Sequence, residues 1–259
     1  MRKDLSGRPS SPEIFGLHFS SLSESEIATL VGTTCRSQQE GVGLIITPNI
    51  QHISMMAHNR LLAQACRDAA ILTCDGFPLF YYARMRGQPV SGRVTGRGIV
   101  ADLMARPDLL RHHRIFMVVD SDRTVTAARK WARAHGLEGN MAYAVPPYGF
   151  ENQAAYGTEL ATSIRAHGTT LLFMAVGAPR SEIFVDQHRD ALPPCWALCI
   201  GQALLVALDL LPEPPRLVQK LNLEWLWRII LEPRRLLTRY ISSACGFMIA
   251  VFKDMRQGD

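Results

Sequence analysis

The sequence predicts an α/β fold with a doubly wound, mainly parallel sheet and a small helical C-terminal appendage. Up to about residue 200, short apolar runs alternate with longer segments of helical periodicity, the pattern of strands followed by crossover helices. Beyond Leu210 this pattern ends at the prolines Pro212, Pro214 and Pro215, and a segment rich in aromatic and basic residues follows. We therefore predict three parts: a flexible tail over residues 1–12, an α/β core over residues 13–211, and a basic amphipathic helical appendage over residues 212–259.

Strands are predicted where short apolar runs stand between turn signals. The run Val42–Ile46 is typical, because the turn-forming residues Thr47, Pro48 and Asn49 follow it directly. Further strands are predicted over residues 13–19, 71–74, 114–119, 141–145, 170–176 and 196–200. Because helices separate these strands, the connections are crossovers, and the sheet is predicted to be mainly parallel and Rossmann-like.

Helices are predicted between these strands, several of them with recognisable capping residues. Ser23 starts a helix that extends to about Gln39, and Asn49 or a neighbour starts one that extends to about Asp68. Other helices are predicted over residues 77–85, 99–105, 124–135, 154–167, 179–189 and 221–231. Pro233 suits the first position of a final helix. Six residues of that helix fall on one face at helical spacing: Leu237, Tyr240, Ile241, Ala244, Met248 and Val251.

The positive charge of the chain is concentrated near its C-terminal end. The 259 residues carry a formal net charge of +5, and the segment from Arg216 to Arg256 accounts for all of it. Its basic residues are interleaved with Leu, Ile, Trp and Phe, which favours a lipid headgroup layer over nucleic acid. No apolar run reaches the roughly 18 residues of a membrane span, and residues 1–12 lack the apolar centre of a signal peptide. We therefore expect a cytoplasmic protein, bound peripherally to the inner face of the cytoplasmic membrane, with no nucleic-acid partner.

Polar residues and glycines follow the predicted strands, where doubly wound sheets bind ligands. A carboxylate in this position, such as Asp75, can be partly desolvated and act as a general base. An arginine such as Arg93 can hold a phosphate through two hydrogen bonds. Together they indicate transfer of a group from a phosphorylated donor. Simpler alternatives remain at each position: a turn at Asp75, a surface ion pair at Arg93, and helix caps at Thr47 and Asn49.

Several short motifs occur in one order along residues 45–240. They are Thr47-Pro48-Asn49, Asp75-Gly76, Arg93-Val94-Thr95-Gly96, Gly177-Ala178-Pro179-Arg180 with Glu182, Leu223-Glu224-Trp225-Leu226 with Arg228, Glu232-Pro233-Arg234-Arg235, and Arg239-Tyr240. In this order and spacing they resemble the WecG/TagA/CpsF family of bacterial glycosyltransferases. The chain departs from the usual family pattern at Ser181, where Gln is common, at Gly201-Gln202-Ala203, and at Glu213-Pro214-Pro215, where the charge is reversed.

The resemblance implies an inverting, metal-independent enzyme without a cofactor. It would move a sugar from a UDP-sugar donor to a polyprenyl-diphosphate-linked saccharide in the synthesis of a cell-surface polysaccharide such as an exopolysaccharide. The implied catalytic residue is Asp75. The implied substrate-binding residues are Thr47, Asn49, Arg93, Thr95, Gly96, Gly177, Pro179 and Glu182, and the lipid diphosphate would be bound by Arg228, Arg235 and Arg239 as the appendage docks on the membrane. The alternative is a non-catalytic nucleotide-sugar-binding or scaffold protein at the membrane. The donor sugar, the polymer and the formation of a homo-oligomer stay open.

No metal site is expected. The six cysteines lack paired CxxC spacing and are predicted to be reduced, mostly buried thiols. The histidines lack zinc spacing, and four of them are predicted to be surface or loop residues: His52, His58, His112 and His113. The carboxylates of Asp120 and Asp122 could share a divalent ion. Alternatively, Ser121 or Asp122 caps the next helix, and the family resemblance favours this second interpretation.

Overall fold

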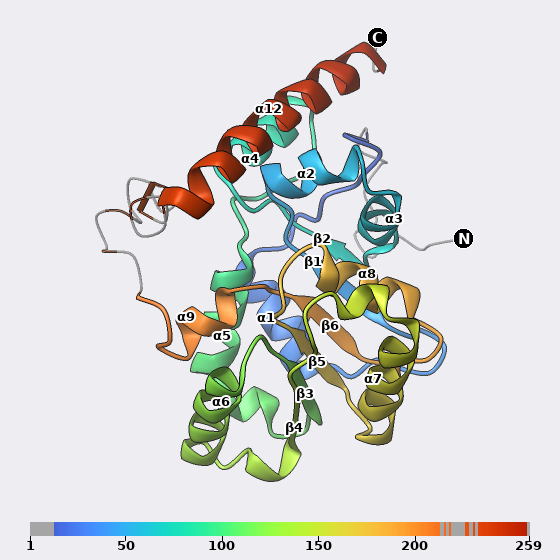
Figure 1. The fold of residues 1–259 in the computed structure, drawn as a ribbon, viewed down its shortest axis with the longest axis vertical. Helices are drawn as coiled ribbons and strands as arrows, with labels where there is room; N and C mark the ends of the chain where they lie inside the picture. The colour runs from blue at the N-terminus through green and yellow to red at the C-terminus, as the bar shows by residue number, and fades with distance from the viewer. Residues whose placement is uncertain are drawn as a thin grey trace.

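The computed structural model describes residues 13–212, 215, 218, 226–227, 230 and 233–257. In this part of the chain six strands form one parallel sheet in the order β2-β1-β6-β5-β3-β4 (Figure 1). The strands are β1 (Gly43–Ile46), β2 (Ile71–Leu72), β3 (Ile115–Val118), β4 (Met141–Ala144), β5 (Leu171–Met174) and β6 (Trp196–Cys199). The strand predicted over residues 13–19 is wrong. That segment forms a tight turn with a bridge between Ile14 and Leu17, because Phe15 and Gly16 have positive φ angles.

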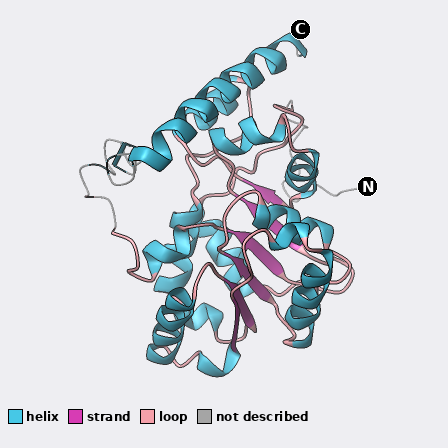
Figure 2. Ribbon diagram, viewed as in Figure 1, coloured by secondary structure: helices cyan, strands magenta, loops and turns pink. Residues whose placement is uncertain are grey.

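Helices cover both faces of the sheet, which confirms the doubly wound architecture (Figure 2). Successive strand residues point to opposite faces, so Leu44 and Ile46 join one core cluster and Ile45 joins the other. The first cluster contains residues of α2 (Ile50–Met56), α3 (Arg60–Asp68), α4 (Phe77–Met85), α7 (Ala154–Ala166) and α8 (Arg180–Gln187). The second contains residues of α1 (Glu24–Thr33), α5 (Gly96–Ala105), α6 (Asp122–Ala134) and α9 (Ala203–Ala207). Within the described residues, short 3-10 helices lie at Pro107–Leu110, Glu138–Asn140 and Phe150–Asn152.

Capping residues determine where several helices begin. Ser23 and Glu26 form the capping box of α1 as the sequence predicts, but the helix ends at Thr33 because Thr34 is extended. The helix predicted from Asn49 to about Asp68 is two helices. Asn59 interrupts it, and its side chain accepts a hydrogen bond from Leu62 N at 3.0 Å to begin α3.

The C-terminal helix α12 (Pro233–Gln257) packs across α2 (Figure 1). Its buried side chains include Phe247, whose ring centroid lies 5.9 Å from that of Phe15 and 6.4 Å from that of Tyr82. Asp254 accepts hydrogen bonds from the Tyr82 hydroxyl at 2.6 Å and from Phe15 N. An added Cβ at Gly246 would lie 2.0 Å from Ser54 Oγ, so only glycine permits this close approach to α2.

The outer side of α12 is apolar and exposed. Four of the six residues predicted to share a face are exposed there, namely Leu237, Ile241, Ala244 and Met248. Tyr240 and Val251 are partly buried instead, because they fall at helical spacing on the side that carries the buried Ser243, Phe247 and Asp254. Ile249, Phe252 and Met255 extend the exposed apolar surface. Among the described helices, none has the length and apolar character required to cross a bilayer.

The thiols follow the prediction, and the loop residue His113 is buried. Four cysteines are buried and all six are free, and burial raises the pKa of Cys66, Cys74 and Cys195 to about 12. His113 lies in a loop, one of the two placements predicted for it, but it is 0% exposed and therefore not at the surface. Thr170 Oγ1 accepts a hydrogen bond from Arg114 N at 3.0 Å, so its hydroxyl proton is available for His113 Nδ1 at 2.9 Å. Burial, followed by the neighbouring His112, lowers the pKa of His113 from 6.5 to about 4.

His113 is expected to make the protein less stable in mild acid. Between pH 6.5 and pH 4 the unfolded chain binds a proton at this imidazole that the folded chain does not. The free energy of unfolding should therefore fall by up to about 3 kcal/mol as the pH decreases across this window. Urea unfolding measured from pH 7 to pH 4 checks this. His113→Gln should flatten the dependence, whereas His58→Gln, at an exposed histidine that does not shift the pKa of His113, should leave it unchanged. An equal acid loss in His113→Gln and the wild type would contradict the assignment.

Candidate functional site

Three loops meet at the carboxyl ends of β1 and β2. Asp75 N–H donates to the carbonyl oxygen of Pro48 at 2.8 Å, and Val94 N–H donates to that of Cys74 at 2.9 Å. The loop after β1, the loop after β2 and the segment leading into α5 therefore lie side by side. The structure thus brings Asp75 next to the predicted site segments 47–49 and 93–96, which are separate in the sequence.

These loops lie next to the point where the connections after two neighbouring strands go to opposite faces of the sheet. β1 leads to α2 on one face and β6 leads to α9 on the other, so the chain diverges between these neighbouring strands. Gly96 lies at this point, where an added Cβ would be 3.1 Å from Thr47 Oγ1 and 3.6 Å from Ile200 Cα. An added Cβ at Gly201, which follows β6, would be 3.8 Å from Gly177 Cα. The Gly177 loop is thereby placed at the same edge as Thr47 and Gly96.

Asp75 and Arg93 share one local environment. Asp75 is half-buried and is followed by Gly76, whose φ of 99° at the N-cap of α4 favours glycine. The Arg93 guanidinium carbon lies 5.1 Å from the centroid of the Phe77 ring, in the first turn of that helix. Arg93 also lines an open cleft of about 440 Å³ with Ser23, Glu24, Ser25, Ser91, Gly92, Val94, Gly98 and Asp102. The cleft lies between the start of α1, the segment 91–94 and α5, and Asp75 is not among the residues that line it.

Thr95 is the N-cap of α5, and its hydroxyl group serves the fold. The oxygen accepts from Gly98 N at 2.9 Å, and the hydroxyl donates to Glu24 Oε1 at 2.7 Å. Thr95 N donates to the same carboxylate oxygen at 2.8 Å. Sequence reasoning does not identify Glu24, because its partner Thr95 lies 71 positions away in the chain. A direct substrate contact by Thr95 stays a prediction.

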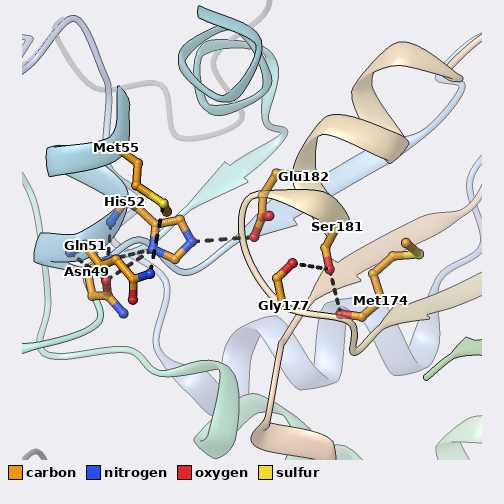
Figure 3. Close-up of polar contacts among 8 residues, drawn as sticks. All are labelled: Asn49, Gln51, His52, Met55, Met174, Gly177, Ser181 and Glu182. Atoms are coloured by element: carbon orange, nitrogen blue, oxygen red, sulfur yellow. Dashed lines mark hydrogen bonds and ion pairs between the residues drawn. The ribbon is translucent and has the colours of Figure 1, made fainter. Parts of the chain in front are cut away.

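Asn49 is the N-cap of α2, as one sequence interpretation proposed. Its Oδ1 accepts hydrogen bonds from Gln51 N at 2.9 Å and His52 N at 3.4 Å (Figure 3). Because the helix engages Oδ1, a ligand contact would be made by the Nδ2 hydrogens. Asn49 would then offer only donors to a ligand, which suits a sugar hydroxyl or a phosphate oxygen.

Glu182 lies inside the protein. It follows the cis Ala178–Pro179 bond in the first turn of α8, and it is 2% exposed. Its Oε1 is 3.5 Å from Nε2 of His52 (Figure 3). His52 is also largely buried and lies on α2, so its prediction as a surface or loop residue is wrong. The neighbouring Ser181, at a position where the family commonly has Gln, directs its hydroxyl to the carbonyl oxygens of Met174 and Gly177, each at 3.4 Å. Substrate contacts by Gly177, Pro179 and Glu182 stay predictions.

The three arginines predicted to bind a lipid diphosphate are only partly covered by the structure. Arg228 lies outside the described residues, and so does the side chain of Arg235. Arg239 is half-buried on α12, with its guanidinium carbon 5.9 Å from the ring centroid of Tyr240. The predicted helix over residues 221–231 and the Glu213 departure also fall largely or wholly outside the described part.

The capping interpretation of Asp120-Ser121-Asp122 is confirmed. The Ser121 side chain accepts from Thr124 N as the N-cap of α6, and Asp120 Oδ1 accepts from the Thr124 hydroxyl at 2.6 Å. Within the described residues, one group of three is close enough to share a metal ion: Cys35, His112 and His113. His112 and His113 precede β3, so this group lies at the amino end of the sheet, away from Asp75.

The sheet and the loops at its carboxyl edge define the class of the protein. It is a doubly wound α/β protein of the kind that binds ligands where the strands end. The sequence profile of the Glycosyl transferase WecG/TagA/CpsF family matches residues 12–259, and the chain belongs to this family, as its motifs predict.

Two relatives carry the name N-acetylglucosaminyldiphosphoundecaprenol N-acetyl-beta-D-mannosaminyltransferase. The protein from Bacillus spizizenii is 23% identical over 238 residues, which cover 90% of this chain and 88% of the relative. The protein from Staphylococcus aureus (strain NCTC 8325 / PS 47) is 18% identical over 249 residues, which cover 95% of this chain and 93% of the relative. The similarity therefore extends over nearly the full length of both relatives.

Proposed function

We propose that the protein is an inverting glycosyltransferase of cell-surface polysaccharide synthesis. It moves a sugar from a UDP-sugar to a polyprenyl-diphosphate-linked saccharide. The names of the two relatives support this, since they describe transfer of an N-acetylmannosaminyl group to a diphosphoundecaprenol-linked sugar. The observation that carries the proposal is the packing of the Asp75 loop against segments 47–49 and 93–96 at the carboxyl edge of the sheet.

In the proposed reaction Asp75 is the general base. Its carboxylate accepts the proton of an acceptor hydroxyl, and the hydroxyl oxygen forms a bond to the anomeric carbon of the donor. The bond from that carbon to the UDP oxygen breaks on the opposite face, which inverts the configuration. One carboxylate suffices, because the diphosphate leaves without being protonated. Arg93 stabilises the negative charge that develops on it.

The other site residues hold the two substrates in line. Thr47 and Asn49 bind sugar hydroxyls on the β1 side, while Gly96 and Gly177 let the donor approach the backbone closely and Pro179 shapes the turn after Gly177. Thr95 and Glu182 act from within the fold, Thr95 by capping α5 and Glu182 through His52. The protein needs neither a metal ion nor a cofactor in this mechanism.

The appendage is proposed to dock on the inner face of the cytoplasmic membrane. Arg228, Arg235 and Arg239 bind the lipid diphosphate there. The exposed apolar side of α12 supports this, as does the contact between α12 and α2, the helix that Asn49 caps. A lipid-linked acceptor bound along α12 would thus present its sugar near the site.

Vesicle binding tests the docking surface. Replacing Met248 and Phe252 by Glu should lower partitioning onto anionic phospholipid vesicles at least about 10-fold, because two apolar side chains no longer enter the interface. Sedimentation with vesicles measures this. Tyr148→Glu is the matched control, since Tyr148 is 91% exposed on the loop after β4, and it should bind like the wild type. Unchanged binding of the double variant would contradict the proposal.

A substrate screen tests the function itself. UDP-sugars are incubated with synthetic prenyl-diphosphate-linked saccharides, and the product is isolated and its anomeric configuration determined. We expect transfer with inversion from at least one donor, at a rate unchanged by EDTA. A protein that binds UDP-sugars without turnover would support the scaffold alternative. Loss of transfer in EDTA, restored by manganese or magnesium, would contradict metal independence.

A further inference from the structure

We propose that His52 and Glu182 form a positioning pair that holds Asn49 in its active orientation. This inference rests on the proposed function, in which Asn49 binds a substrate sugar. His52 comes from α2 and Glu182 from α8, and their side chains point toward one another across the space between the two helices (Figure 3). The residues are distant in the sequence, so the pair exists only in the folded protein.

The two ring nitrogens of His52 have different partners. Nδ1 lies 3.4 Å from Asn49 N and 3.2 Å from Asn49 Oδ1, to which it could donate only if it carried the proton, and Nε2 lies 3.5 Å from Glu182 Oε1. A neutral imidazole carries one proton. When Nδ1 accepts the Asn49 N–H and completes the capping box of α2, the proton is on Nε2 and faces the carboxylate. Glu182 therefore selects the tautomer that closes the cap.

Glu182 is well suited to this single contact. It lies in the first turn of α8, where the helix dipole favours a carboxylate. Its Oε2 is buried and has no hydrogen-bond partner within the described part of the chain. A buried carboxylate with one unsatisfied oxygen stabilises a fold less than an apolar side chain of similar size would. Its contribution is therefore the orientation that it imposes on His52.

The pair acts on Asn49, which directly follows Pro48, the residue whose carbonyl group binds the Asp75 backbone. The carbonyl oxygen of Pro48 accepts from Asp75 N, and Asn49 follows directly with its side chain fixed on Gln51 N and His52 N. The pair also ties this loop to the Gly177 loop, because α8 begins at Arg180. Without the contact between His52 and Glu182, the loop after β1 and the Gly177 loop should shift relative to one another. A displacement of about 1 Å in an active site can lower the rate about 100-fold.

Steady-state kinetics of single variants test the pair. His52→Ala should lower kcat about 10- to 100-fold with KM changed less than about 3-fold, because positioning rather than ground-state binding is lost. His52→Gln should recover kcat to within about 3-fold of the wild type, since Gln at this position closes a capping box. Glu182→Gln should reduce kcat, yet add little in the His52→Ala background, because the two residues act through one contact.

Three results would contradict the proposed role of His52 and Glu182. They are an unchanged kcat in His52→Ala, a His52→Gln variant as slow as His52→Ala, and additive losses in the double variant. Thermal unfolding of each variant checks that the fold is retained. Nitrogen NMR of the histidine rings tests the proposed tautomer of His52 without an activity measurement. We expect His52, identified by its absence in His52→Gln, to carry its proton on Nε2, and a proton on Nδ1 would refute the proposal.

If the wild type transfers no sugar in the screen, the proposed function fails. The NMR result then still stands as the test of the contact between His52 and Glu182. If the wild type is active but His52→Ala equals it, the positioning role alone fails.

Discussion

Asp75→Asn is expected to lower the rate of sugar transfer by about 100- to 10,000-fold, because an amide cannot take the acceptor proton. The fold should be retained, since the contact that places residue 75 is a backbone hydrogen bond to Pro48 and the amide has the same shape as the carboxylate. Turnover of a UDP-sugar with a lipid-linked acceptor measures the effect. A near-normal rate would show that another group is the base.

Asp120→Asn is the matched control for this experiment. Asp120 is also a carboxylate at the carboxyl end of a strand, but it accepts from Thr124 and supports the start of α6. We expect its substitution to change the rate less than about 2-fold. A large loss with Asp120→Asn instead would favour a metal-binding role for that loop.

Asp254→Ala is expected to lower the free energy of unfolding by about 3 kcal/mol. The substitution leaves the Tyr82 hydroxyl and Phe15 N–H without their acceptor in a buried place. Burial, together with the hydrogen bond to Asp254, raises the pKa of Tyr82, so this hydroxyl keeps its proton and requires an acceptor. Denaturant unfolding measures the loss.

Two further variants make the Asp254 experiment specific. Tyr82→Phe added to Asp254→Ala should recover part of the stability, because it removes an unpaired donor. Asp108→Ala should cost less than about 0.5 kcal/mol, since Asp108 is 82% exposed in its pair with Arg111. Similar losses for Asp254→Ala and Asp108→Ala would mean that α12 is held mainly by its apolar contacts.

The sequence predicts most of the sheet because apolar runs and turn residues are local signals. Val42–Ile46 and Thr47-Pro48-Asn49 give β1 and the start of α2, and Asn49 is already recognisable as a cap. The break at Asn59 has a local signal too, but the continuous helical pattern around it conceals the second cap. The turn at Phe15 has no local signal in the sequence. The positive φ of Phe15 depends on the packing of its ring against Tyr82 and Phe247, which are distant in the sequence.

The candidate site is predictable in part. The position of Asp75 after a strand indicates the edge on which it lies, and the family motifs indicate its neighbours. The contact of His52 with Glu182 and that of Glu24 with Thr95 join distant segments, so no periodicity or spacing reveals them. The burial of His113 is hidden for the same reason, since Thr170 that covers its Nδ1 belongs to another part of the chain.

The hydrogen bond between Phe15 and Asp254 bears on the order of folding. It joins residues 239 positions apart, and contacts of such separation are slow to form because a long loop must close first. We expect the α/β core to assemble early and α12 to join it last. An intermediate with a finished sheet and an undocked helix that exposes its apolar side chains would then be the species most prone to aggregate, and the one that a lipid surface could bind before α12 docks.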